Sequence, residues 1–125
     1  MDTIHLIHPA KLDEAVKIAR LLGNKTRIQI LYLLKQRQYN VTELQNILQI
    51  EQSSLSHQLK ELRDYQLISQ KRDGKSIYYQ LTDPHIISTM DSILAHTDHV
   101  LTGIRHDGVV LDQEIEIDGN TGDEK

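Results

Sequence analysis

The sequence contains no cysteine, and it also lacks tryptophan and phenylalanine. A chain without cysteine can form neither a disulfide nor a thiolate metal site, so any metal ion must be bound by nitrogen and oxygen ligands. The five tyrosines are the only large aromatic side chains. This scarcity argues against the stacking platforms on which many proteins bind single-stranded nucleic acids.

Long apolar runs are absent as well. No segment approaches the roughly 18 apolar residues of a membrane-spanning helix, and the chain does not begin with the charged and then apolar leader of a secreted protein. We therefore expect a cytoplasmic protein. Its 125 residues correspond to one ordinary domain with a single small core.

The acidic residues are unevenly distributed, and this hides a basic segment behind a net charge of −4. Residues 108–125 carry six acidic residues and one lysine, whereas residues 25–79 carry nine lysines or arginines and five acidic residues. A local positive excess has the sign that contact with DNA phosphates requires. We expect an ordered domain over residues 1–107 and an acidic, disordered tail over residues 108–125.

Apolar residues at helical spacing predict four helices in the first half of the chain, over residues 9–22, 26–37, 41–50 and 53–65. Gly23 is a stop signal for the first helix. Thr42 is the expected N-cap of the third helix, and either Gln52 or Ser53 opens the fourth.

Two runs with the composition of β-strands follow, residues 67–71 and 76–81. The segment Arg72–Lys75 separates them and contains Asp-Gly, a strong hairpin signal. A final helix is predicted from Pro84 to about Ile104.

This order of elements predicts a mainly α fold with a small β-hairpin. Two short helices joined by a tight turn and followed by a hairpin are typical of the winged helix-turn-helix. The final helix is long and apolar enough to form a dimer seam. We therefore expect a homodimer that forms through the N- and C-terminal helices.

The final helix also carries a pattern of possible metal ligands, an Asp-x-His pair and a His-x-x-His pair: Asp83, His85, His96 and His99. Asp83 is the expected N-cap, before Pro84 at the first helical position. At about 100° per residue, the eleven steps from His85 to His96 make three turns plus about 20°, and His99 lies about 40° to the other side. The three imidazoles therefore share one helix face.

The three histidines cannot reach one ion within a single chain. A rise of about 1.5 Å per residue separates His85 from His96 by roughly 16 Å along the axis, whereas zinc holds its ligands at about 2 Å. If the same helix of a second copy runs antiparallel alongside, Asp83 and His85 of one chain meet His96 and His99 of the other. We predict two shared sites per homodimer; surface histidines on an amphipathic helix are the alternative.

Three segments and the ligand pattern resemble the ArsR/SmtB family of winged-helix metal-sensing repressors, over about residues 12–104. LGNKTRIQILYLL resembles the start of that family's second helix, SSLSHQLKELRDYQLI its recognition helix and KRDGKSIYYQLTD its wing. The ligand pairs resemble the site on the fifth helix of the zinc- and cobalt-responsive members, whose four ligands come from two protomers. Other members use a Cys-x-Cys pair on the third helix, and its absence from VTELQNIL argues against thiolate sensing of arsenic, cadmium or lead.

Three imidazoles with one carboxylate suit Zn²⁺ in a closed four-coordinate site. Ni²⁺ or Co²⁺ with more ligands is the alternative. His5, His8 and His106 are the candidates for additional ligands, and surface histidines are the other interpretation of these three residues.

In a winged helix-turn-helix, the second helix of the motif lies in the major groove of DNA. Side chains in its first half reach base edges, basic side chains further along contact phosphates, and the hairpin tip reaches the adjacent backbone or minor groove. The candidate DNA contacts, in that order, are Gln52, Ser53, Ser56, His57, Lys60, Arg63, Arg72 and Lys75.

The ligand pattern and the resemblance together imply a transcriptional repressor that binds a palindromic operator as a metal-free homodimer and is released by Zn²⁺, or by Co²⁺ or Ni²⁺. By resemblance, the controlled genes would serve metal efflux or homeostasis. The alternative is a winged-helix regulator with incidental histidines. The sequence disfavours a metal-dependent hydrolase, because it has no His-Glu-x-x-His motif and no general base beside the ligands. We therefore do not expect an enzyme.

Overall fold

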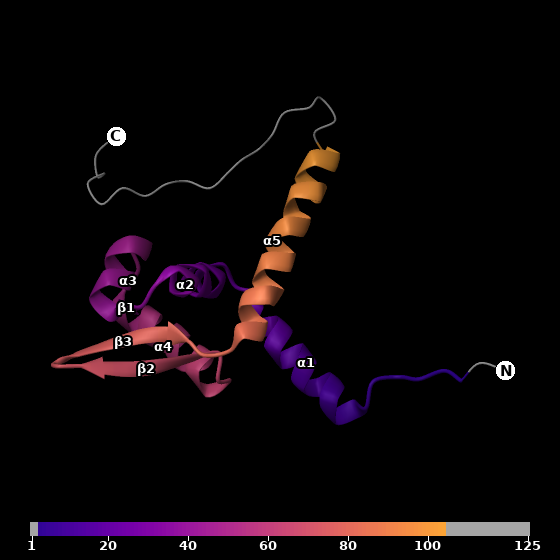
Figure 1. Cartoon of the computed structure of the whole chain (residues 1–125), viewed down its shortest axis with the longest axis horizontal. Helices are drawn as coiled ribbons and strands as arrows, with labels where there is room; N and C mark the ends of the chain where they lie inside the picture. Colours follow the sequence, from indigo (N-terminus) through magenta and orange to yellow (C-terminus); the bar gives the residue numbers. More distant parts are fainter. Residues whose placement is uncertain (1–2, 105–125) are drawn as a thin grey trace. The chain divides into compact units, whose positions relative to one another are not determined.

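The computed structural model describes residues 3–104, and contacts divide the chain into two compact units, Met1–Asp83 and Pro84–Lys125 (Figure 1). The second unit contains α5 (Pro84–Ile104). The first contains, in chain order, α1 (Pro9–Leu22), α2 (Lys25–Gln36), β1 (Tyr39–Asn40), α3 (Val41–Leu48), α4 (Gln52–Asp64), β2 (Ile68–Asp73) and β3 (Ser76–Leu81). This order confirms the predicted winged helix-turn-helix. The expected acidic tail and His106 lie outside the described residues.

The helices end close to their predicted bounds. α4 begins at Gln52, one of the two expected starts, and α5 spans Pro84–Ile104 as predicted. None of the helices within residues 3–104 combines the length and the apolar character needed to cross a membrane.

The sheet has three antiparallel strands in the order β1-β3-β2, one strand more than the predicted hairpin. β1 pairs with β3, with Tyr39 opposite Tyr79 and Asn40 opposite Tyr78. A strand of two residues is too short to show an alternating pattern in the sequence. Tyr39 and Tyr79 are both buried, so the unpredicted strand adds Tyr39 to the core, opposite Tyr79 of β3.

The turn of the hairpin is shorter than the sequence suggested. β2 extends to Asp73, which pairs with Ser76, so Arg72 belongs to the strand and only Gly74 and Lys75 form the loop. Gly74 has a φ of +66°, whereas Lys75 has a negative φ. A positive φ at the first loop residue alone is typical of a type II′ turn. The prediction of a four-residue separator was therefore wrong by two residues.

The N-cap of α3 is Asn40 and not Thr42. The Asn40 side chain accepts a hydrogen bond from the Glu43 backbone N–H at 2.8 Å, and the Glu43 carboxylate accepts one from the Asn40 N–H at 2.9 Å. This reciprocal pair is a capping box. Thr42 lies exposed inside the helix. Both residue types favour caps, and each is followed three positions later by a residue that suits a capping box, Glu43 or Gln45, so the sequence alone does not separate them.

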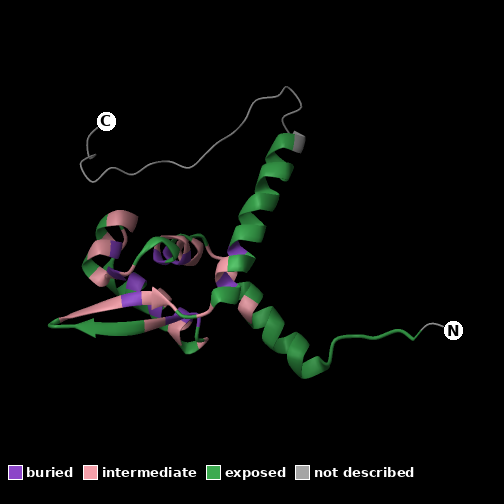
Figure 2. Ribbon diagram, viewed as in Figure 1, coloured by how far each residue is buried: buried purple, intermediate pink, exposed green. Residues whose placement is uncertain are grey.

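The core of the first unit lies between α2, α3, α4 and the sheet (Figure 2). α4 presents Leu55, Leu59 and Leu62 to this core, at the spacing of one helix face. The other buried apolar residues of the unit are Leu21, Ile30, Leu31, Leu34, Tyr39, Leu44, Leu67, Ile68 and Tyr79. Because one face of α4 is fixed against the core, its opposite face is presented to solvent.

Two helices leave apolar side chains exposed. Within α1 only Leu21 is buried, while Leu12 and Val16 are 45% and 43% exposed, although their spacing predicts an inward face. In α5, every residue from Asp91 to Thr102 is exposed. An apolar helix face that remains in water indicates that a partner covers it.

The capping box generates a stability prediction. Asn40→Ala removes the side-chain acceptor and is expected to lower the free energy of unfolding by about 1 kcal/mol. The control, Thr42→Ala, removes an exposed hydroxyl outside the box and is expected to change it by less than about 0.5 kcal/mol. Urea denaturation at one protein concentration measures both values. An equal or larger effect at Thr42 would contradict the assigned cap.

Candidate metal centre and nucleic-acid interface

Three of the four predicted metal ligands lie on α5, a single continuous helix. Asp83 is the residue directly before the helix, and Pro84 occupies its first position, where no N–H is needed. His85 is the second helical residue, and His96 and His99 lie in the second half of the helix. Asp83 is half-buried and the three histidines are exposed.

His96 and His99 form a close pair. Their ring centroids are 5.9 Å apart and the rings meet edge to face, at 89°. The His-x-x-His spacing produces this contact because residues three apart are neighbours on a helix surface. Two imidazoles on one zinc ion, each with Zn–N of about 2.0–2.1 Å, place their centroids roughly 5 Å apart, so small rotations of the two side chains suit a shared ion.

His85 belongs to the opposite end of α5. Eleven residue steps separate it from His96 by roughly 16 Å along the helix axis. Within residues 3–104, no three histidine, aspartate or glutamate side chains are grouped so that they could hold a metal ion. The candidate ligands of one chain therefore fall into two separate pairs, one near each end of α5.

An apolar hollow lies beside the His96 end of this helix. Its lining comes from α5 alone: Ser92, Ile93, His96, Thr97, Val100 and Leu101. His96 is thus both a candidate ligand and part of an apolar surface. A partner that covered the hollow would also approach the imidazole.

The predicted DNA contacts of α4 lie away from its three buried leucines. Gln52, Ser53, Ser56, His57 and Lys60 are exposed, whereas Arg63 is half-buried. Gln52 and Ser53 fall in the first turn, where a reading helix approaches base edges. On the wing, Arg72 is exposed on β2 and Lys75 is exposed in the turn.

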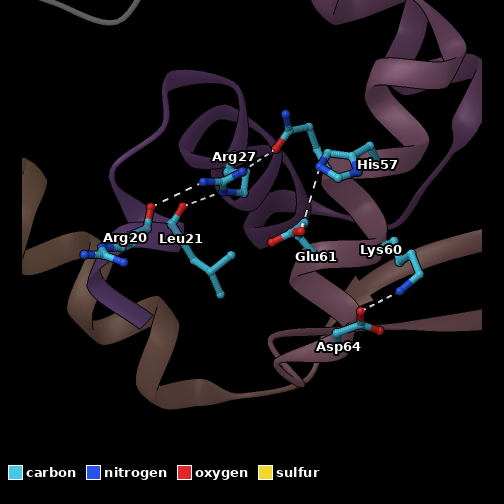
Figure 3. Close-up of polar contacts among 8 residues, drawn as sticks. Arg20, Leu21, Arg27, His57, Lys60, Glu61 and Asp64 are labelled. Atoms are coloured by element: carbon cyan, nitrogen blue, oxygen red, sulfur yellow. Dashed lines mark hydrogen bonds and ion pairs between the residues drawn. The ribbon is translucent and has the colours of Figure 1, made fainter. Parts of the chain in front are cut away.

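Two basic side chains of α4 contact carboxylates one turn further along the same helix (Figure 3). Lys60 Nζ lies 2.7 Å from Asp64 Oδ2, and His57 Nε2 lies 3.8 Å from Glu61 Oε2. Lys60 and His57 were both predicted to contact DNA, and their contacts with Asp64 and Glu61 were not predicted. Their signal was present as acidic residues at i+4.

The comparisons with known proteins agree with the winged helix-turn-helix fold. Residues 24–70, from the end of the α1–α2 connection into β2, match the family model described as bacterial regulatory protein, arsR family. The transcriptional regulator NmtR of Mycobacterium tuberculosis is 36% identical over 99 residues, which cover 77% of this chain and 82% of the relative. A homolog of the cadmium resistance transcriptional regulatory protein CadC from Staphylococcus aureus is 26% identical over 88 residues, covering 70% and 73%.

Among solved structures, the chain resembles the homodimeric winged helix-turn-helix DNA-binding domain of a possible ArsR-family transcriptional regulator from Mycobacterium bovis. The TM-score is 0.71 at 23% identity, over 82% of this chain and 95% of the other. This likeness supports the fold, and the identity and coverage of the NmtR match support the family. The chain therefore belongs to the arsR family of bacterial regulatory proteins and is a transcriptional regulator rather than an enzyme.

Proposed function

We propose that this protein is a metal-responsive repressor, which binds operator DNA in the cytoplasm as a metal-free homodimer and releases it when its α5 sites are occupied by Zn²⁺. The genes it controls would serve metal efflux or homeostasis. The observation that carries the proposal is the placement of two ligand pairs at opposite ends of one helix, with apolar side chains exposed between them.

Dimerisation supplies what one chain lacks. When two copies of α5 run antiparallel, Asp83 and His85 of each approach the His96–His99 pair of the other. Ile93, Leu94 and Val100 are 43%, 36% and 49% exposed, and burying them in such a pair is favourable. The Mycobacterium bovis relative of the same fold is homodimeric, which supports this assembly.

The donor set favours Zn²⁺. Three imidazole nitrogens and one carboxylate oxygen complete a tetrahedral site, and no cysteine is present to favour a softer ion. Co²⁺ or Ni²⁺ with more ligands is the alternative, and His5 and His8, both exposed before or at the start of α1, are then the described candidates. The Staphylococcus aureus relative is a homolog of a cadmium resistance regulatory protein, which supports a response to a divalent metal.

Release requires two dimer conformations. The shared sites must be better formed in the conformation whose two α4 helices are wrongly spaced for DNA, because a ligand shifts an equilibrium only by its differential affinity. Linkage then requires that DNA weaken metal binding by the same factor by which metal weakens DNA binding. Equilibrium DNA binding with and without Zn²⁺, Co²⁺ and Ni²⁺ is the direct test. A regulator unaffected by all three ions would be the winged-helix protein with incidental histidines.

The carboxylates of α4 are expected to restrain DNA binding. Asp64→Asn removes the partner of Lys60 and one negative charge near phosphates, so affinity for a duplex of scrambled sequence should rise about threefold. The control, Glu14→Gln, removes the partner of Lys17 in a similar exposed pair on α1 and should leave affinity unchanged. Fluorescence anisotropy at several salt concentrations measures both. An unchanged affinity for Asp64→Asn would show that Lys60 makes no phosphate contact.

Substitution of a candidate ligand on α5 is expected to abolish the response to metal and to leave DNA binding without metal nearly unchanged. His96→Ala should abolish Zn²⁺-driven release while operator affinity without metal changes less than about threefold, because the residue lies outside the reading helix. Asp98→Ala, an exposed acidic residue on the same helix, is the control and should respond normally. Full dissociation of the His96→Ala variant on addition of Zn²⁺ would remove this histidine from the site.

A mixed dimer tests whether ligands are shared. One chain carries Asp83→Ala with His85→Ala, and its differently tagged partner carries His96→Ala with His99→Ala. In the heterodimer all four lesions fall on one site, so one Zn²⁺ should bind per dimer, whereas each mutant homodimer should bind none and the unaltered dimer two. Equilibrium titration of the purified species measures this. A heterodimer that binds no Zn²⁺ would exclude sites shared between chains.

A further inference from the structure

One half-buried guanidinium in the first unit joins three helices (Figure 3). Arg27 lies in the first turn of α2, where its Nε donates to the Leu21 carbonyl oxygen at 2.7 Å and its Nη2 to the Arg20 carbonyl oxygen at 3.3 Å. Its Nη1 donates to Gln58 Oε1 on α4 at 2.6 Å. A single side chain thus connects the C-terminus of α1 with the middle of the helix that carries the candidate DNA contacts.

The α1 end of this connection is favourable for a cation. The last carbonyl oxygens of a helix have no partner within the helix and carry the negative end of its dipole. Arg20 and Leu21 are the last two residues of α1 before its final residue, Leu22. The Arg20 carbonyl oxygen also accepts a hydrogen bond from the Gly23 N–H, at 3.1 Å. Hydrogen bonds from a charged donor are shorter and stronger than neutral ones. The guanidinium is therefore held firmly at the end of α1.

The hydrogen bond from Arg27 to Gln58 fixes the rotation of α4 about its axis, which the packing of its leucines leaves open. Leu55, Leu59 and Leu62 anchor one face of α4 in the core, but apolar burial is non-directional. The hydrogen bond to Gln58 requires a narrow range of distance and angle. It therefore limits rotation of α4 about its own axis, and with it the direction in which the neighbouring His57 and Ser56 point.

We propose that Arg27 is a positioning residue: through Gln58 it sets the orientation of α4 relative to α1, and thereby the spacing of the two α4 helices in the dimer. Exposed Leu12 and Val16 on α1 make this helix part of the expected dimer seam, so Arg27 transmits the position of the seam to the reading helix. The inference rests on the proposed function for the dimer and for DNA reading by α4.

The absence of cysteine allows a direct measurement of the spacing. Ser54→Cys, at an exposed position of α4 outside the candidate contacts, places one spin label on each protomer of the full chain. Electron paramagnetic resonance then measures the distance between the two labels. Gln58→Leu should broaden or shift this distribution. Gln58→Glu, which keeps an acceptor for Arg27, should retain the narrow distribution and shows whether loss of the bond, and not substitution itself, is responsible.

The control is Arg20→Gln, which removes an exposed charge close by but keeps the carbonyl oxygen that Arg27 contacts; its distance distribution should match the unaltered protein. An operator selected by the unaltered protein from a randomised duplex pool provides a second readout. Gln58→Leu should bind it about tenfold more weakly, because α4 without the hydrogen bond would occupy the orientation that fits the operator only about a tenth of the time. Its affinity for a scrambled duplex should change less than about threefold, because phosphate contacts remain.

The possible results distinguish failure of the positioning role of Arg27 from failure of the proposed function. If Gln58→Leu matches Arg20→Gln in label distance and in the ratio of the two affinities, the positioning role is overturned while the proposed function stands. If the unaltered protein selects no operator, the proposed function fails, and the label distances alone decide whether Arg27 fixes α4. Circular dichroism establishes that each variant is folded; should Gln58→Leu unfold, Arg27→Lys keeps the charge but loses the forked geometry and is expected to broaden the distances in the same way.

Discussion

The fixed axial spacing of residues along α5 is the constraint on which the proposed metal centre depends. A helix advances about 1.5 Å per residue, and no side-chain rotation brings His85 to the ion that His96 could bind. The ligand pairs are therefore either unrelated or completed by another chain. Their placement on a common face, with apolar residues between them, favours completion by a second copy of the same helix. The site would then be a property of the dimer and not of the fold of one chain.

The exposure of apolar side chains on α1 also favours a second copy of the chain as the partner. The core between α2, α3, α4 and the sheet accounts for most of the buried apolar side chains of the first unit, and α1 contributes only Leu21. Leu12 and Val16 repeat at the spacing of a buried face but remain exposed. Since burial is favourable at roughly 25 cal/mol per Å² of apolar surface, an interface over α1 would supply stability that the small core does not.

Local patterns in the sequence predicted the helices and the hairpin, whereas contacts between residues far apart in the sequence were not predicted. Helical spacing predicted α4 and α5, and Asp73-Gly74 predicted a hairpin, although its loop has two residues and not the four of Arg72–Lys75. The two residues of β1 carry no periodic signal, and they become a strand only because β3 offers a partner. Thr42 and Asn40 are each followed by a suitable capping-box partner, and only the hydrogen bonds between Asn40 and Glu43 identify the cap. The hydrogen bond between Arg27 and Gln58 joins residues that are 31 positions apart, and no local sequence pattern predicts it. The four ligand residues were found by spacing alone, yet their partner across the dimer is a prediction that one chain does not test.

Regulation by a site shared between protomers needs no path of altered contacts through the core. If each metal site takes two ligands from each of the two chains, its geometry is set by the relative placement of the two protomers. The spacing of the two α4 helices is set by the same placement, provided that each α4 is held rigidly to its own dimer helix. Arg27 offers such a hold, because its hydrogen bonds reach the carbonyl oxygens of α1 and the side chain of Gln58 together. In such a dimer, the relative placement of the two protomers alone would couple metal binding to DNA binding. Loss of the Arg27 hydrogen bonds would weaken this coupling without removing either binding site.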